Sequence, residues 1–450
     1  MGEMEVPAEA LWGASTQRAV LNFPVSGERL DPDLIHAYGL IKWAAAKANG
    51  VLGVIPSELT ALIETAASEV FEGRHDGHFV VDVFQTGSGT STNMNVNEVI
   101  ANRCSLLAGE LPGSKRPIHP NDHVNQSQSS NDTFPTAMHV AAAMALKESL
   151  IPALEKTRDS LAVKAGDFHE VLKIGRTHLM DATPVRLGQE FGGYARQLDL
   201  AVVRANKALK ALHELPLGGT AVGTGLNCPA GFAERAIVFI AEKTGIPFVE
   251  AENHFEAQSA RDAIVEVSGQ IKTIATSLFK IANDIRWLSS GPRCGIGEIA
   301  LPATQPGSSI MPGKVNPVMA ESLMQVCAQV IGNDTAVTWG GANGNFELNV
   351  MMPMMAQNTL RSIRLLSGVL APFREKCLDG ITANEERCVG LIEWSMAMVT
   401  TLAPRIGYEL ATEIAKEAVV RGKTVRQICE ERAILPAEEL AAALDPRGMV

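Results

Sequence analysis

The segment GSSIMPGKVNP, residues 307–317, joins an irregular stretch to an apolar one. The irregular stretch, 291–317, holds five glycines and five prolines in 27 residues. A loop of that length inside a compact domain is usually functional. Asn316 followed by Pro317 is typical of an N-cap and a first helical residue, with Glu321 one turn further on. The segment therefore predicts that Lys314 and a run of backbone N–H groups lie near a helix N-terminus, which favours negative charge.

Most of the remaining chain shows apolar residues at helical spacing, and alternating β-branched runs are scarce. Several predicted helices approach 30 residues, well above the globular mean of about 11–12. We therefore expect a mainly α fold built around a bundle of long helices. The predicted helices are approximately Leu34–Gly50, Thr92–Leu107, Thr136–Ala165, Pro184–Leu212, Ala257–Leu288, Pro317–Val330, Val350–Leu370 and Asn384–Ala418.

Breaks in the helical pattern suggest three domains. The segment 109–132 is rich in Gly, Pro, His and Asn, and a softer break lies near 349–353. We expect an N-terminal helical domain at 1–118, a central bundle at 119–350 that includes the loop 291–317, and a small C-terminal helical domain at 351–450.

Composition narrows the classes of function. The 450 residues include 39 Lys and Arg against 50 Asp and Glu, a net charge of −11. This argues against nucleic-acid coating and requires local positive groups for any anionic substrate. Seven cysteines without CxxC spacing indicate reduced thiols. No signal, transit or membrane-spanning segment is apparent, so we expect a soluble, cytoplasmic protein, or a mitochondrial one if a presequence is absent from this sequence.

Three further polar loops resemble the first. They are 87–90, 129–132 and 176–178, and each is expected to place hydroxyls or amides at a helix start. Any one alone is more often a simple cap. Together with Lys314 they predict a pocket for a small anion with more than one carboxylate.

The sequence contains no complete motif for binding a nucleotide cofactor or a metal ion. The run 218–223 has phosphate-loop spacing, but Thr224 stands where lysine is needed, and the GxGxxA pattern at 295–300 follows a helix. The histidine pairs at 75/78 and 119/123 lack the further ligands of a metal set. We expect no metal and no cofactor.

These motifs together resemble the fumarase/aspartase superfamily. Residues 307–316 match its signature GSSxMxxKxN, with Glu321 at the expected place, and the resemblance covers nearly the whole chain. It is most similar to class II, iron-independent fumarases, because His178 stands where aspartases have Gln and Ser130 where they tend to have Thr. Mild departures are Thr92, Val96 and Ala320. The other matching segments are 11–13, 85–90, 119–125, 128–132, 175–182, 218–225 and 344–349.

The resemblance implies a three-domain fold whose bundles join into a homotetramer, with each active site built from three subunits. It also implies the reversible hydration of fumarate to L-malate, a step of the tricarboxylic acid cycle. The implied roles place Ser308 as the base, His178 with Glu321 at the water end, and Lys314 with Asn316 around the developing charge. The implied substrate-binding residues are Ser88, Gly89, Thr90, Ser129, Ser130, Asn131, Thr177, Ser309, Lys314 and Asn316. An implied second dicarboxylate pocket comprises Arg116, His119, Pro120, Asn121 and Asp122.

Two rival interpretations remain. One is another lyase of the superfamily, such as an aspartate ammonia-lyase, and His178 speaks against it. The other is a non-catalytic structural homologue, which has no reason to keep Ser308, Lys314, Asn316, His178 and Glu321 together.

Overall fold

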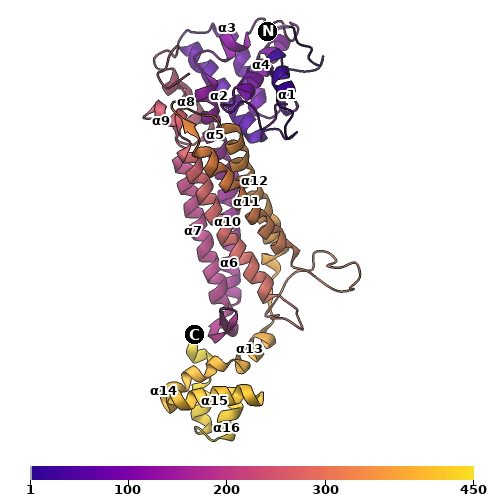
Figure 1. Cartoon of the computed structure of the whole chain (residues 1–450), viewed down its shortest axis with the longest axis vertical. Coiled ribbons are helices and arrows are strands. Elements are labelled where there is room, and N and C mark those ends of the chain that lie inside the picture. The colour runs from indigo at the N-terminus through magenta and orange to yellow at the C-terminus, as the bar shows by residue number, and fades with distance from the viewer. Residues whose placement is uncertain (1–2) are drawn as a thin grey trace. The chain divides into compact units, whose positions relative to one another are not determined.

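The computed structural model describes residues 3–450 and is mainly α, as predicted (Figure 1). Its contacts divide the chain into two compact units, each built from three segments. Unit 1 comprises 3–152, 202–276 and 326–367, and unit 2 comprises 153–201, 277–325 and 368–450. The division into three sequential domains stays a prediction.

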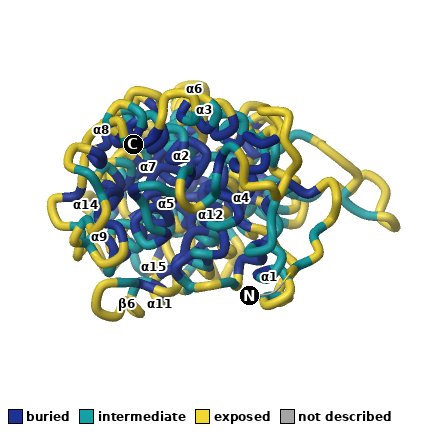
Figure 2. The backbone as a smooth tube through the Cα atoms, turned by 90° about the horizontal axis from the view of Figure 1, so that it is seen from above, coloured by how far each residue is buried: buried dark blue, intermediate teal, exposed yellow. Residues whose placement is uncertain are grey.

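Unit 1 is built around two buried helices, α2 (Pro32–Val51) and α5 (Ser130–Ala145) (Figure 2). Helix α2 packs against α3, α5 and α8, and α4 packs against α1 and α3. Two short sheets lie in the same unit: a parallel pair, β3 and β4, and an antiparallel hairpin, β6 and β7. The remaining elements are α1 (Ala14–Asn22), α3 (Ser57–Phe71), η1 (Asp76–His78), α4 (Thr90–Leu107), the π-helix η2 (Pro120–Val124), β3 (Glu214–Leu215), α8 (Phe232–Thr244), β4 (Val249–Glu250), α9 (His254–Ser259), β6 (Gly344–Asn345) and β7 (Leu348–Asn349).

Helix α5 continues through the π-turn η3 (Leu146–Leu150) into α6 (Ile151–Asp167). This continuous helix, Ser130–Asp167, is long and apolar enough to cross a membrane by length and composition alone. The sequence had suggested no such segment. More than half of the apolar window, 56%, is buried inside the protein, as in the core helix of a soluble protein.

Four further long helices have residues in both units: α7 (Leu187–Ala211), α10 (Asp262–Leu288), α11 (Val318–Gly341) and α12 (Met352–Lys376). Polar contacts join them inside each unit. In unit 2, the Tyr194 hydroxyl donates to Asp284 at 3.0 Å. In unit 1, Asp334 accepts from Ser268 at 2.8 Å and from Lys272 at 2.6 Å. The predicted long helices are thus confirmed, with ends shifted by several residues.

Unit 2 holds an antiparallel hairpin, β1 (Leu172–Thr177) and β2 (Met180–Arg186), and a short pair, β5 (Ile299–Ala300) with β8 (Thr382–Ala383). Ile174 of the hairpin packs into a small apolar core formed by residues 392–444. That core is supplied by α13 (Glu385–Trp394), η5 (Met396–Thr401), α14 (Ala403–Ile406), α15 (Tyr408–Arg421), α16 (Val425–Glu431) and α17 (Ala437–Ala443), with η4 (Leu378–Gly380) before it and η6 (Pro446–Met449) after it.

Several predicted helix boundaries are wrong. The single helix predicted over 384–418 is broken, because Ser395 is extended and Gly407 has a φ of 86°. The helix predicted from Pro184 begins only at Leu187, since 180–186 form β2. The helix predicted from Ala257 breaks at Ala260, whose backbone is extended. Helices α3 and α8 were not predicted.

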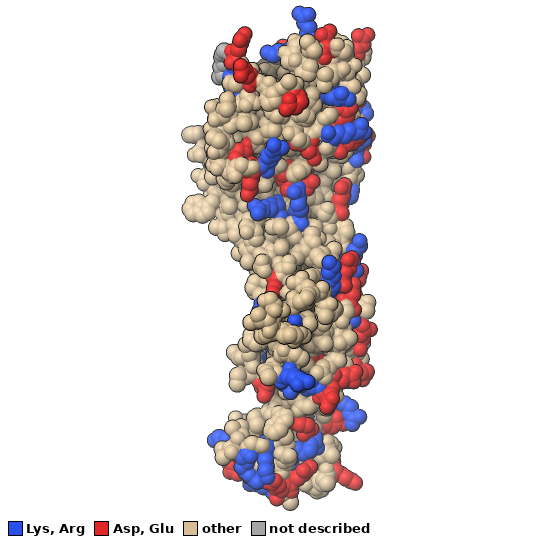
Figure 3. Space-filling view, turned by 90° about the vertical axis from the view of Figure 1, so that its right-hand side faces the viewer, with Lys and Arg blue, Asp and Glu red and all other residues tan. Residues whose placement is uncertain are grey.

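Acidic and basic side chains lie beside one another on the face shown in Figure 3, with uncharged surface between them. The net charge of −11 is therefore not gathered into one field on that face. An anion must be met by local groups, as the sequence indicated.

Candidate active site

Three hydroxyls form a hydrogen-bonded chain at the starts of α4 and α5 in unit 1. Ser88 and Thr90 are 2.9 Å apart, and Thr90 and Ser130 are 2.8 Å apart. Helix α4 begins at Thr90 and α5 at Ser130, so two helix N-termini meet here. Hydroxyls that can each donate or accept, beside the free N–H groups of a helix start, suit the binding of a carboxylate.

Glycine makes this close approach possible. Gly89 has a φ of 73°, and a Cβ built there would lie 1.8 Å from the ring of Phe134 on α5. Any other residue at 89 would force the two helix starts apart.

The start of α5 also anchors a second loop. Ser129 caps the helix by accepting from Asn131 N at 3.2 Å. Asp132 accepts from the amides of Gly218 and Thr220 at 3.1 and 3.0 Å, and the Asn131 side chain donates to Ala221 O at 2.8 Å. Burial raises the pKa of Asp132, while these amide donors oppose the rise. The predicted residues Ser88, Gly89, Thr90 and Ser129–Asn131 are thus brought together with the loop 218–225.

The signature loop of unit 2 closes on itself at its base. Gly307 N donates to Lys314 O at 2.9 Å, and the Asn316 amide donates to Gly307 O at 2.8 Å. The prediction that Asn316 is the N-cap of the following helix is wrong, because α11 begins at Val318. The Asn316 side chain closes the loop instead, because the carbonyl of Gly307 lies within its reach.

Ser308 sits inside this closed loop. Its Oγ accepts from the amides of Met311 at 3.1 Å and Ile310 at 3.3 Å. Ser309 and Lys314 are exposed, and Ser308 is half-buried. Donors aimed at a hydroxyl oxygen stabilise its anionic form.

A cavity of about 650 Å³ in unit 2 lies beside the end of the loop. Lys314, Asn316 and Glu321 line it together with Arg286 of α10 and Ser290. Three of the five residues proposed for catalysis therefore share one cavity wall, and its two cations offset its one carboxylate.

The prediction that Thr177 and His178 lie at a helix start is wrong, because they lie at the tip of the β1–β2 hairpin. Thr177 pairs with Met180, and the turn residues His178 and Leu179 have φ values of 58° and 61°. Two positive φ values define the tight type I′ turn of hairpins, which costs strain in residues other than Gly, Asn or Asp. His178 is exposed, and within residues 3–450 no hydrogen bond joins it to Glu321 or Ser308.

The segment 116–122 of unit 1 leads into η2, whose N-cap is His119. His119 Nδ1 accepts from the amides of Asn121 and Asp122 at 3.3 and 3.2 Å. The Asp122 carboxylate lies 3.3 Å from the same nitrogen. Pro120 is the first residue of η2, and the Arg116 side chain is exposed.

Sequence reasoning missed a buried polar network beneath the loops of unit 1. The Lys42 ammonium donates to Gln128 at 2.9 Å and to Asn125 at 3.1 Å, and Asn93 donates to the same Asn125 oxygen at 3.0 Å. Burial lowers the pKa of Lys42 to about 7. The available signal was Lys42 within the apolar run Tyr38–Ala46 of α2.

No group of three or more His, Cys, Asp or Glu suited to a metal ion occurs in the described part of the chain, 3–450.

Comparison with known proteins assigns the family. A family model described as "Lyase" matches residues 2–332, and one described as "Fumarase C C-terminus" matches 398–450. The chain belongs to this lyase family.

Individual relatives point to one class of enzyme within this family. A "Fumarate hydratase class II" from Mycobacterium tuberculosis is 54% identical over 100% of this chain and 94% of its own length. A "Fumarate hydratase, mitochondrial" from Mus musculus is 52% identical over 100% of this chain and 89% of its own. The crystal structure of a class II fumarase from Schistosoma mansoni superposes with a TM-score of 0.95 at 40% identity, covering 99% of this chain and 96% of that one. This chain is therefore similar to class II fumarate hydratases along its whole length.

Proposed function

We propose that this chain is a hydro-lyase that adds water reversibly to fumarate to give L-malate. The observation that carries the proposal is the sequence identity of 52–54% to class II fumarate hydratases over the whole chain. The polar loops that the sequence singled out are present and ordered at two helix starts, one hairpin tip and one cavity wall.

In the direction of dehydration, a base must remove a weakly acidic proton next to a carboxylate. The product is an aci-carboxylate, with two negative charges on one carboxyl group, and preorganised donors must stabilise it. We assign the base to Ser308, because two backbone amides already donate to its oxygen. Lys314 and Asn316 follow Ser308 in the same loop. Lys314 supplies positive charge for the intermediate, and Asn316 supplies a side-chain amide.

His178 with Glu321 is assigned to the hydroxyl end of the substrate, as the general acid that releases water. In one chain the two residues lie on different elements, the hairpin tip and α11. We therefore propose that the two residues of one active site come from different chains.

The substrate carboxylates are assigned to the hydroxyl and amide groups of the other loops. The two helix starts of unit 1 offer N–H groups and a chain of three hydroxyls to one carboxylate. Thr177 and Ser309 extend the set from unit 2. We assign no metal and no cofactor to this chemistry.

We propose a homotetramer whose active sites each draw on three chains. The hairpin tip supports this, since Leu179 and Met180 are 63% and 69% exposed in one chain, and so does Ile310 of the signature loop at 83%. Large apolar side chains at the tips of polar catalytic loops are expected to be covered by neighbouring subunits. The second dicarboxylate pocket at Arg116 and His119–Asp122 and a cytoplasmic location remain parts of the proposal.

The decisive assay follows the loss of fumarate ultraviolet absorbance in metal-free buffer with a chelator present. Turnover to L-malate under these conditions supports both the substrate and cofactor independence. Absence of turnover, together with release of ammonia from aspartate, would instead assign the chain to the ammonia-lyases.

A further inference from the structure

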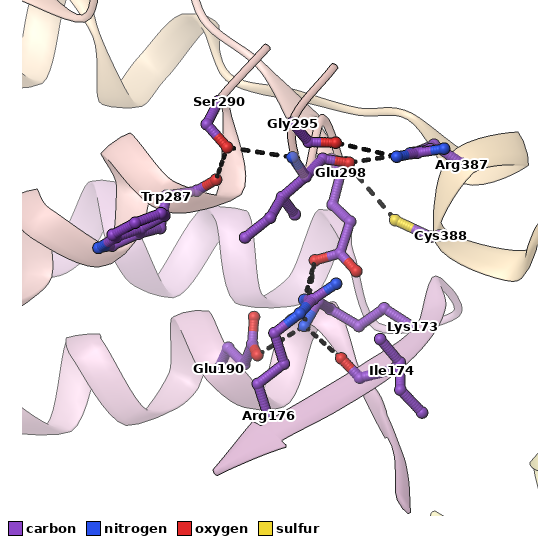
Figure 4. A network of polar contacts seen from close by, with 11 residues as sticks. Lys173, Ile174, Arg176, Glu190, Trp287, Ser290, Gly295, Glu298, Arg387 and Cys388 are labelled. Carbon is purple, nitrogen blue, oxygen red and sulfur yellow. Dashed lines mark hydrogen bonds and ion pairs between the residues drawn. The ribbon is translucent and has the colours of Figure 1, made fainter. Parts of the chain in front are cut away.

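Four charged side chains of unit 2, two of them buried and two half-buried, form an ion cluster between the β1–β2 hairpin and residues 291–306, the stem of the signature loop (Figure 4). We call Lys173, Arg176, Glu190 and Glu298 the buried tetrad. The Lys173 ammonium lies 2.8 Å from Glu190 and 3.3 Å from Glu298, and the Arg176 guanidinium lies 2.9 Å from the same Glu298 oxygen. The two cations and two anions cancel.

Burial makes this arrangement costly. The side chains of Lys173 and Glu298 are 1% and 0% exposed. One oxygen of Glu190 and one of Glu298 are buried without a donor among the described residues. Burial also raises the pKa of Glu190. Buried ion pairs contribute little net stability over apolar packing, so stability alone does not account for this cluster.

The backbone is shaped to bring both cations to Glu298. Residues 173 and 176 are separated by an odd number, so a regular strand would direct them to opposite faces. The register of the hairpin shifts between Ile174 and Arg176, and both side chains reach the same carboxylate. Gly175 permits the irregularity, because a Cβ there would lie 2.6 Å from Thr183 O.

Glu298 is itself fixed from the opposite side. Its carbonyl accepts from Asn384 N at 2.9 Å, and its amide donates to Leu288 O at 2.9 Å. The Arg387 guanidinium donates to the carbonyls of Gly295 and Ile296, both at 2.9 Å (Figure 4). The stem of the signature loop is thus a rigid point to which the hairpin is tied.

The tetrad lies next to two segments that carry residues of the proposed active site, the hairpin turn and the signature loop. Arg176 directly precedes the strained turn that carries Thr177 and His178, and Glu298 directly precedes β5, which leads toward Ser308. No hydrogen bond in the described chain holds the His178 ring, so its orientation depends on the strand beneath it.

We propose that the buried tetrad is a set of positioning residues that fixes the hairpin tip bearing His178 against the stem of the loop bearing Ser308. The inference rests on the proposed roles of those two residues. It holds whether the two elements of one chain enter one active site or two, because the tetrad acts at their roots.

The test compares Glu298→Gln with Glu431→Gln, a matched change in an exposed ion pair with Arg421. We expect Glu298→Gln to lower kcat on fumarate by about 10- to 100-fold, since small misplacements of catalytic groups have effects of this size. KM should change far less, and the pH profile of kcat should shift because the environment of His178 changes. Glu431→Gln should match the wild type in all three.

A charge-balanced double variant separates positioning from packing. Lys173→Met alone should behave like Glu298→Gln, whereas Lys173→Met with Glu298→Gln leaves one cation and one anion and should recover part of kcat. If Glu298→Gln does not fold, Glu190→Gln, whose side chain is 26% exposed, carries the same test. Folded variants with wild-type kcat and an unchanged pH profile would overturn the inference.

Hydrogen exchange followed by mass spectrometry reads positioning without activity. Peptides covering 172–186 should exchange faster in Glu298→Gln than in the wild type or in Glu431→Gln. Equal exchange would contradict the proposal. If the wild type does not turn over fumarate, the proposed function fails, while this comparison still decides whether the tetrad holds the hairpin.

Discussion

The proposed base, Ser308, lies in a turn whose backbone donates to its side chain. The turn that follows it aims two amides at its oxygen, and Lys314 lies on the same loop. A free serine hydroxyl is a poor base, so these donors must favour the alkoxide. The residue pattern indicated the lysine, but only the folded turn supplies the amides.

Replacing Ser308 by Ala removes the proposed base and leaves the surrounding donors in place. We expect kcat to fall by at least about 100-fold with KM changed only a few-fold, because the group acts in the transition state. Steady-state kinetics on fumarate and L-malate measure both. Ser57→Ala, at the exposed start of α3, is the control and should leave both constants unchanged. Near-normal turnover of the Ser308 variant would remove Ser308 from the base role.

At the scale of elements, the starts of α4 and α5 pack so closely that no side chain fits between Gly89 and the Phe134 ring. Gly89 must adopt a positive φ and must also admit the Phe134 ring. Two helix N-termini can then direct their N–H groups to one place. The sequence marks the glycine, but the ring lies 45 residues further along and is identified only by packing.

Gly89→Ala should separate these two demands when compared with Gly53→Ala. Gly53 also has a positive φ, of 70°, but has open space around its Cβ position. We expect Gly89→Ala to lower Tm by about 4 °C or more and to weaken substrate binding, with a much smaller Tm change for Gly53→Ala. Calorimetry and KM measurements check this. Equal losses in the two variants would show that backbone strain, and not the ring, sets the cost.

Helices α3 and α4 are joined by a pH-dependent contact. Arg103 donates to both oxygens of Glu69, at 2.6 and 2.9 Å, and His75 lies 2.9 Å away. The Arg103 hydrogen bonds are the main cause that lowers the pKa of Glu69 to about 2 from its ordinary 4.5.

A depressed folded-state pKa adds stability that is fully present above 4.5 and is lost as pH falls through the folded value. We therefore expect the difference in Tm between the wild type and Arg103→Gln to be largest near neutral pH and to narrow as pH falls below 4.5. Thermal melts across that range measure it. A difference that stays constant with pH would exclude Glu69 as the source.

At the scale of the whole molecule, we propose an active site that draws on more than one chain. His178 and Glu321 lie on separate elements of unit 2, and the described chain has no hydrogen bond between them. Exposed apolar residues at the hairpin tip and the signature loop support the proposed homotetramer, in which another subunit would cover them.

Co-expression of two inactive variants tests this directly. If each site takes Ser308 and His178 from different chains, mixed oligomers of Ser308→Ala and His178→Asn chains should regain up to about a quarter of wild-type activity. Separately purified variants that are never mixed provide the baseline. Mixed oligomers confirmed by mass spectrometry but without recovered activity would place both residues in one chain's contribution.

The secondary structure was predicted well where helices are long and poorly where they are short. The prediction for 34–50 matches α2 closely, because apolar residues recur over many turns. Residues 384–418 were predicted as one helix although Ser395 and Gly407 interrupt it. The β1–β2 hairpin was missed because Lys173 and Arg176 break its apolar pattern, and both are satisfied only by carboxylates distant in the chain.

The sequence by itself determined the helical class, the family and the loops that carry the polar chemistry, because these depend on local periodicity and short motifs. The tertiary structure decided which of those loops meet and what holds them. The start of α5 is tied to 218–220 through Asp132, and the hairpin is tied to Glu298 through the buried Lys173 and the half-buried Arg176. Such long-range pairs leave no periodic signal, since their energy arises only when burial removes water from charges that folding has brought together.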